Sequence, residues 1–251
     1  MRLRPVFRLL LAGLLMALVP GLQAEPLTLE SPVERVNLLE LYTSHGCSSC
    51  PPADAWLRGL EEHPGLWRRL IPIAFHVDYW DDLGWPDRFA TATYTQRQRD
   101  YRRSGALQSV YTPGFVLNGR EWRGWFRRHQ PDLQSQAKVG RLTLRVESGQ
   151  GVKVRFAPTS QLEGVALQAN LALLGFGLST PVGGGENRGH TLKEGFVVLS
   201  HNHADALGDD NGWRFDWPDI PATEASKLAL VVWLNHPGSA EPVQAAGGWL
   251  P

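Results

Sequence analysis

Apolar residues in the first half of the chain gather in short runs, separated by segments with helical spacing. Two apolar runs, residues 36–42 and 70–77, predict strands, and the near-continuous apolar character of 70–77 suits a sheet covered on both faces. Apolar positions at helical spacing predict one helix over about 50–63 and a second over about 87–103. An Asn-Gly pair at 118–119, between two strand-like runs, predicts a β-hairpin. The first half is therefore expected to alternate strands with helices.

The second half has a different pattern, in which short segments alternate between apolar and polar residues. Turn-forming glycines and prolines lie between these segments. Several short strands separated by turns are typical of a β-sandwich. The change of periodicity near residue 139 predicts a domain boundary, with one domain over 30–138 and another over 139–251. The strand-like segments are residues 141–146, 152–156, 166–174, 192–199 and 227–234.

The N-terminus has the pattern of a secretory signal peptide over residues 1–24. Arg2, Arg4 and Arg8 precede an apolar stretch at 9–19, and a small residue ends the segment. The apolar stretch is too short for a comfortable membrane span, so we expect no stable span after cleavage, with an uncleaved anchor as the alternative. The sequence therefore predicts a periplasmic or secreted protein.

Composition narrows the possible chemistry. Basic and acidic residues are equal in number, 25 each, which gives no support for nucleic-acid binding. The chain has only two cysteines, Cys47 and Cys50. Export would place them where disulfides persist, and no other cysteine is present to build a disulfide scaffold.

A strand, a Cys-x-x-Cys pair and a helix in succession are the context of a thioredoxin-type redox site. A cysteine at a helix N-terminus has a lowered pKa, which favours the nucleophilic thiolate. Cys47 would attack and Cys50 would resolve the mixed disulfide. Two alternatives stay open: half of a zinc site, or an inert structural disulfide in a ring too small to stabilise the fold much.

Glu40 is the only carboxylate in the first predicted strand. A carboxyl group buried behind a dithiol would have a raised pKa and could carry protons for the exchange. The alternative is an exposed strand residue without a role in the chemistry.

Residues 36–138 resemble the thioredoxin-like superfamily, with the redox pair at the start of the first helix and a proline before the third strand. The resemblance implies that Pro113 is a cis-proline and that Thr112 is the substrate-binding residue. The sequence departs from that family where Gly46 replaces the tryptophan that commonly precedes the first cysteine. Ser48-Ser49 also replaces the familiar residues between the cysteines, so the resemblance does not fix the direction of electron flow.

A closer resemblance covers nearly the whole mature chain. It joins the sequence to a secreted bacterial family called "domain of unknown function 1223", in which Gly114 departs from an expected glutamine. This resemblance implies a thioredoxin-like domain and an extracytoplasmic location, but no substrate. The segments that carry it are residues 39–44, 46–54, 76–81, 111–113 and 185–187.

Together these patterns predict an α/β thioredoxin-like domain followed by an all-β sandwich-like domain. We expect an exported thiol–disulfide oxidoreductase with catalytic Cys47, Cys50 and Glu40 and substrate-binding Thr112 and Pro113. Its partners would be protein thiols or disulfides, and it would require no metal or dissociable cofactor. The second domain would dock a partner protein or arrange a homodimer.

Two other functions remain open from the sequence. The protein could be a non-catalytic binding protein whose disulfide is structural. It could also handle a metal ion through Cys47, Cys50 and a histidine such as His45 or His76.

Overall fold

The structure, a computed structural model, describes residues 26–134, 137–147, 150–206, 211–218 and 224–251. The signal peptide predicted for residues 1–24 lies outside these ranges. Within them, no helix has both the length and the apolar character needed to cross a membrane.

The described residues form two α-helices, several 3-10 turns and many strands. The helices are α1 Pro51–Gly59 and α2 Ala92–Arg103, and the turns are η1 Leu60–Glu62, η2 Asp81–Leu83, η3 Trp125–Arg127 and η4 Ser160–Leu162. The strands are β1 Leu27–Glu30, β2 Asn37–Thr43, β3 Leu70–His76, β4 Gly114–Leu117, β5 Arg120–Glu121, β6 Gly140–Glu147, β7 Gly151–Pro158, β8 Gln168–Phe176, β9 Leu178–Pro181, β10 Thr191–Glu194, β11 Val197–Asp205, β12 Gly212–Phe215, β13 Lys227–Asn235 and β14 Pro242–Trp249.

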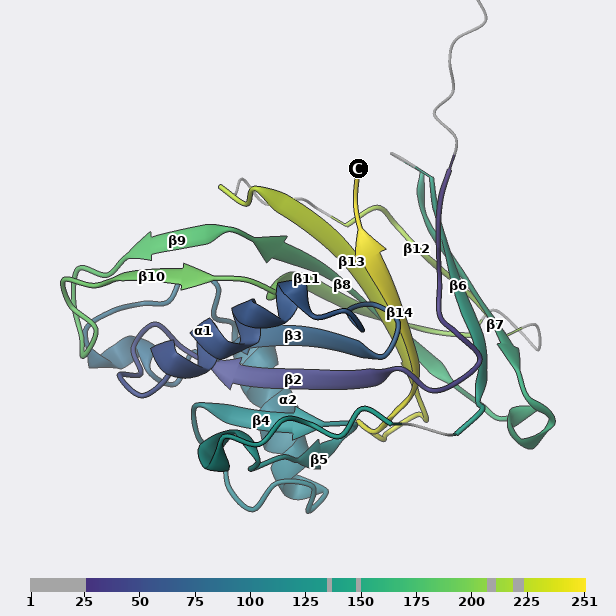
Figure 1. Cartoon of the computed structure of the whole chain (residues 1–251), viewed down its shortest axis with the longest axis horizontal. Coiled ribbons are helices and arrows are strands. Elements are labelled where there is room, and N and C mark those ends of the chain that lie inside the picture. The colour runs from purple at the N-terminus through teal and green to yellow at the C-terminus, as the bar shows by residue number, and fades with distance from the viewer. Residues whose placement is uncertain (1–25, 135–136, 148–149, 207–210, 219–223) are drawn as a thin grey trace, which may run out of the picture.

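One eight-stranded sheet forms the centre of the molecule, in the order β14-β13-β8-β11-β3-β2-β4-β5. β2 and β3 run parallel, and β11 joins β3 in parallel where Val197 faces Ala74. The remaining neighbours in this sheet are antiparallel. α1 lies in front of β2 and β3 and α2 lies behind them (Figure 1).

The predicted fold class, an α/β thioredoxin-like domain followed by an all-β sandwich-like domain, is wrong. Among the described residues, strands account for 42% and helices for 16%, so this part of the protein is mostly β-sheet. The strands of the first half do not form a sheet of their own, because β8, β11, β13 and β14 continue it. Periodicity predicts that a strand exists, but it does not specify which distant strand lies beside it.

Both faces of β8 and β13 are covered, which explains their near-continuous apolar sequences. Successive side chains of a strand point to opposite faces. Ala172 and Leu174 therefore join the core around α1, β2 and β3, while Leu171 and Leu173 join a second core. That second core is closed by a four-stranded sheet in the order β1-β6-β7-β12.

A separate two-stranded hairpin, formed by β9 and β10, lies along α1. Arg58 of α1 donates a hydrogen bond to the backbone oxygen of Lys193 in β10, at 2.5 Å. The tip of this hairpin, residues 182–190, lies at the same end of the molecule as the start of α1 (Figure 1). We call residues 182–190 the cap loop.

Two local turns set the ends of their elements. The α2 helix begins at residue 92, later than predicted, because the Thr91 hydroxyl accepts a hydrogen bond from the backbone N–H of Tyr94 and caps the helix. The hairpin prediction at 118–119 is confirmed, since β4 and β5 pair on either side of it. Both turn residues have positive φ, 49° and 80°, which favours Asn and Gly there.

Candidate functional site

The two cysteines lie in the loop that joins β2 to α1, and they form a disulfide with a Cα–Cα distance of 5.4 Å. Cys50 is the N-cap residue of α1. Ser48 and Ser49 between the cysteines are exposed, whereas both cysteine side chains are fully buried. A thiol that attacks this disulfide can therefore reach it only after neighbouring residues move away from the sulfur atoms.

The start of α1 offers few backbone N–H groups to a thiolate. The two prolines that begin the helix have none, and the next two N–H groups are donated to the Cys50 carbonyl oxygen at 2.8 and 3.1 Å. A thiolate at Cys47 would therefore be stabilised by the helix dipole and by the hydroxyl of Ser49, whose Oγ lies 3.3 Å from Cys47 Sγ.

The cap loop binds the backbone of residues 45–50, which we call the cysteine segment, through polar side chains. Nδ2 of Asn187 donates to the carbonyl oxygens of His45 and Cys47, at 2.8 and 3.0 Å. The Glu186 carboxylate accepts the backbone N–H of Ser48 at 3.0 Å. Asn187 is buried while Glu186 is exposed, so the cap loop contributes one buried anchor and one exposed contact.

The glycines of the cap loop permit close packing against η2 and the turn that follows it. A Cβ on Gly184 would lie 2.3 Å from the carbonyl oxygen of Gly84, and a Cβ on Gly183 would lie 2.9 Å from the ring of Trp85. The run of three glycines is therefore a packing feature that brings the cap loop against this turn.

Trp80 contacts both Thr112 and the cysteine segment, so it lies between that segment and the Thr112–Pro113 bond. The Thr112–Pro113 peptide bond is cis, as predicted. Nε1 of Trp80 donates to the Thr112 hydroxyl at 2.9 Å, and a Cβ on Gly46 would lie 2.8 Å from the Trp80 Cβ. The approach of Trp80 explains why a glycine stands at position 46.

Glu40 lies on the face of the sheet that α2 covers, and its carboxylate is fully engaged there. Nε and Nη2 of Arg97 bind its two oxygens at 2.8 and 2.9 Å. The hydroxyls of Tyr101 and Tyr42 donate to the same oxygens at 2.5 and 2.8 Å. Within the described chain none of these bonds reaches the cysteines, so a proton-carrying role for Glu40 stays a prediction.

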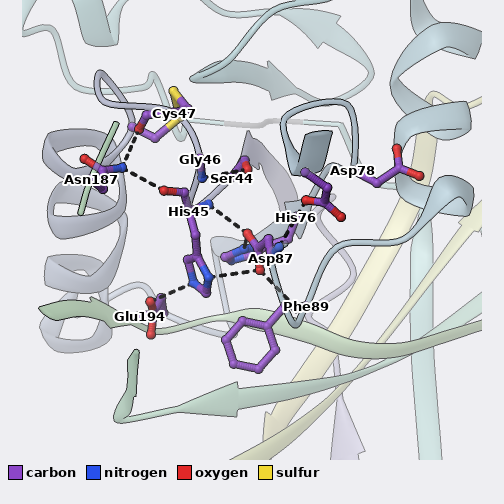
Figure 2. A network of polar contacts seen from close by, with 12 residues as sticks. Ser44, His45, Gly46, Cys47, His76, Asp78, Asp87, Phe89, Asn187 and Glu194 are labelled. Carbon is purple, nitrogen blue, oxygen red and sulfur yellow. Dashed lines mark hydrogen bonds and ion pairs between the residues drawn. A yellow bond between two sulfur atoms is a disulfide. The ribbon is translucent and has the colours of Figure 1, made fainter. Parts of the chain in front are cut away.

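A buried cluster of two histidines and two carboxylates lies behind the cysteine segment (Figure 2). His45 follows β2, His76 ends β3, Asp87 precedes α2 and Glu194 ends β10. Nδ1 and Nε2 of His45 lie 3.1 Å from Asp87 and 2.9 Å from Glu194. Nδ1 of His76 lies 2.7 Å from the other oxygen of Asp87. All four residues are buried, and we call them the histidine–carboxylate cluster.

The pKa values in this region reflect burial opposed by charge. Burial by itself would raise the pKa of Asp87, but its contacts with His76 and His45 lower that pKa to about 2. Burial disfavours protonation of His76, yet the charge and hydrogen bond of Asp87 outweigh it and raise the His76 pKa. Burial raises the pKa of Asp54, in the first turn of α1, to about 7, and the nearby His76 lowers it in part.

The sequence patterns identified only part of this site. The sequence predicts His45 and His76 only as added ligands for a metal held by the cysteines, and it assigns no role to Asp87, Glu194 or Asn187. Asn187 does lie in one of the segments that carry the family resemblance, which is a signal that could have identified it. Asp87 and Glu194 carry no comparable signal, because only the fold brings them to the histidines.

Comparison with known proteins gives one matching family and two solved structures of similar fold. A family model described as "Protein of unknown function (DUF1223)" matches residues 38–235. A crystal structure of an Agrobacterium tumefaciens protein is 26% identical, with a TM-score of 0.58, over 85% of this chain and 94% of that one. HBP35 of Porphyromonas gingivalis is 12% identical, with a TM-score of 0.55, over 86% of this chain and 76% of its own, a likeness of fold alone. No curated protein matches the chain.

Proposed function

The chain belongs to the DUF1223 family, and we propose that it is an exported thiol–disulfide oxidoreductase whose reactive group is the Cys47–Cys50 pair. The observation that carries the proposal is that the disulfide is buried beside contacts that a loop movement can release. Both cysteines are buried, and the glycine-rich cap loop holds their backbone through hydrogen bonds from Asn187 and to Glu186, which can be exchanged for water when the loop moves. Cysteines three positions apart close too small a ring to stabilise the fold much.

The proposed reaction transfers two electrons and two protons from the partner's thiols to the cysteine pair. A partner thiolate attacks Cys47 Sγ, the bond between the two cysteines breaks, and Cys50 leaves as a thiolate that takes up a proton. A second partner thiolate then attacks the partner's sulfur in the mixed disulfide and releases Cys47. The partner is oxidised to a disulfide and the cysteine pair is reduced to a dithiol. The same steps in reverse would reduce a partner.

Thr112 and Pro113 are the proposed contact for the partner chain. They lie next to Trp80, which in turn packs against Gly46, so a peptide bound along this loop would approach Cys47 from the side of Trp80. Glu40 has no assigned step in the proposed reaction, because its contacts are Arg97 and two tyrosines.

The proposed location is periplasmic or secreted, on the basis of the signal-like pattern in residues 1–24. In such a compartment a dithiol protein can pass disulfides to partners or keep them reduced. Fractionation of cells that express the full-length protein tests this location, and recovery of uncleaved chain in the cytosol contradicts it.

A second candidate function is a binding protein that keeps its disulfide permanently. The complete burial of Cys47 and Cys50 favours this candidate, because inert structural disulfides are typically inaccessible. Its reduction potential would lie below about −300 mV, out of reach of glutathione.

Equilibration of the protein in glutathione buffers separates the two functions. We expect a potential between about −270 and −120 mV, the range of working oxidoreductases. A potential well below about −300 mV would overturn the proposal in favour of the binding protein.

A trapping experiment tests the roles of the two cysteines. Cys50→Ser should accumulate mixed disulfides with partner proteins through Cys47, because the resolving thiol is missing. Cys47→Ser is the matched control and should trap far fewer. Equal trapping by both variants contradicts the assigned order of attack.

A further inference from the structure

We propose that His45, His76 and Asp87 form a binding site for a single divalent transition-metal ion of the zinc type. The site is distinct from the cysteines, both of whose sulfurs are occupied by the disulfide. Its donors come from three separate segments, after β2, at the end of β3 and before α2. The inference does not depend on the oxidoreductase proposal.

The distances among the donors suit a small metal ion. One donor atom from each residue lies within 4.8 Å of the other two. The two Asp87 oxygens lie 3.1 Å from His45 Nδ1 and 2.7 Å from His76 Nδ1. Ligands about 2.0–2.2 Å from a tetrahedral zinc ion are roughly 3.3–3.6 Å apart. Each contact would therefore open by less than about 1 Å to admit the ion.

Groups around these donors already hold them in position. Glu194 lies 2.9 Å from Nε2 of His45, the nitrogen that faces away from Asp87. Metal-binding histidines usually donate their second ring N–H to a carboxylate in this way. The backbone N–H groups of His45 and Phe89 donate to Asp87 at 2.8 and 3.0 Å, which fixes the carboxylate.

Two members of the cluster, His45 and Glu194, lack side-chain hydrogen bonds of good geometry within the described chain. Among the described residues, neither ring nitrogen of His45 and neither oxygen of Glu194 has a hydrogen bond of acceptable geometry, although all four atoms are buried. Buried polar atoms without partners are costly, and each costs about 1–3 kcal/mol in proteins. A cation bound at His45 Nδ1 would orient the His45 ring so that its Nε2–H donates to Glu194.

The donor set selects the class of metal. Two imidazoles and one carboxylate suit zinc, iron, cobalt or nickel, whereas calcium and magnesium prefer oxygen ligands. The ring of Phe89 packs against both histidines, with centroid distances of 5.6 and 5.4 Å, and excludes water from that side. Three protein ligands leave a fourth position for water or another small ligand.

The test is zinc binding by the intact, disulfide-bonded protein after treatment with a chelator. We expect one zinc ion per chain by equilibrium dialysis, and visible absorption bands of four- or five-coordinate cobalt when Co²⁺ replaces zinc. Asp87→Asn should abolish both signals. Glu194→Gln alters only the neighbouring group, so it should keep the fold and weaken affinity by about 10–100-fold.

Two controls make the result decisive. His201→Gln removes a histidine of β11 that contacts Asn170 and Trp233. Cys47→Ser with Cys50→Ser removes both sulfurs. Both proteins should bind zinc as the unaltered protein does. Absence of stoichiometric zinc overturns the site. Binding that survives Asp87→Asn, an unchanged affinity in Glu194→Gln, or loss of binding in the double cysteine variant also overturns it.

Discussion

Asn187→Ala should make the buried disulfide much easier to reduce. The side chain is 5% exposed and donates two hydrogen bonds to the cysteine segment, at 2.8 Å to His45 and 3.0 Å to Cys47. Each such bond contributes about 0.5–1.5 kcal/mol net. If both break when the cap loop opens, their loss favours opening by about 1–3 kcal/mol, which is roughly 5- to 150-fold in population.

The assay is the rate of reduction by a small dithiol under native conditions, followed by alkylation of the released thiols. When opening and closing are fast, this rate is proportional to the open population. Asn187→Ala should therefore be reduced about 5- to 150-fold faster than the unaltered protein. The rates should converge when both proteins are denatured.

Asn235→Ala is the matched control, because Asn235 is also 5% exposed and also donates two bonds to backbone oxygens, at 2.9 and 2.7 Å. It lies at the end of β13, so its loss should lower global stability without opening the cap loop. Reduction of Asn187→Ala at the unaltered rate, or equal acceleration in both variants, would refute the reasoning that the cap loop gates the disulfide.

Three further predictions concern the frame around the site. Arg97→Met should lower the free energy of unfolding by about 3–5 kcal/mol, because it leaves the Glu40 carboxylate buried without its charge partner. Urea denaturation measures this loss. Adding Glu40→Gln to Arg97→Met should restore much of it, because the buried charge is then removed. Burial, together with the charge of Arg97, lowers the pKa of His201 to about 3, so its protonation favours the unfolded state and stability falls as pH drops below about 6.5. Because His201 is partly exposed, we expect less than the full value of about 1.36 kcal/mol per pH unit. Between pH 6 and 4, the unfolding free energy of the unaltered protein should fall more steeply than that of His201→Gln, by roughly 0.5–1 kcal/mol per pH unit. Equal slopes in the two proteins contradict this cause. Gly184→Ala should lower the melting temperature and speed disulfide reduction, because its Cβ would lie 2.3 Å from a backbone oxygen, whereas Gly59→Ala, with open space in α1, should be neutral or stabilising.

Local features of this protein follow from short stretches of sequence. Pro51 and Pro52 place the start of α1, the Asn-Gly pair at 118–119 forms its hairpin, and the apolar runs become β2 and β3. Each depends on the dihedral preferences of a few neighbouring residues or on the period of burial along one strand. The cysteine pair at a helix N-terminus belongs to the same class of inference.

The strand order and the surroundings of the cysteines were decided by tertiary structure alone. β11 pairs with β3 although more than a hundred residues separate them, and this pairing makes one large sheet where the sequence suggested two domains. The same long-range folding brings Asp87 and Glu194 to His45 and places the cap loop against the backbone of His45 and Cys47. A residue's local pattern specifies its own conformation and which side is buried, but the partner it is buried against depends on how the whole chain closes.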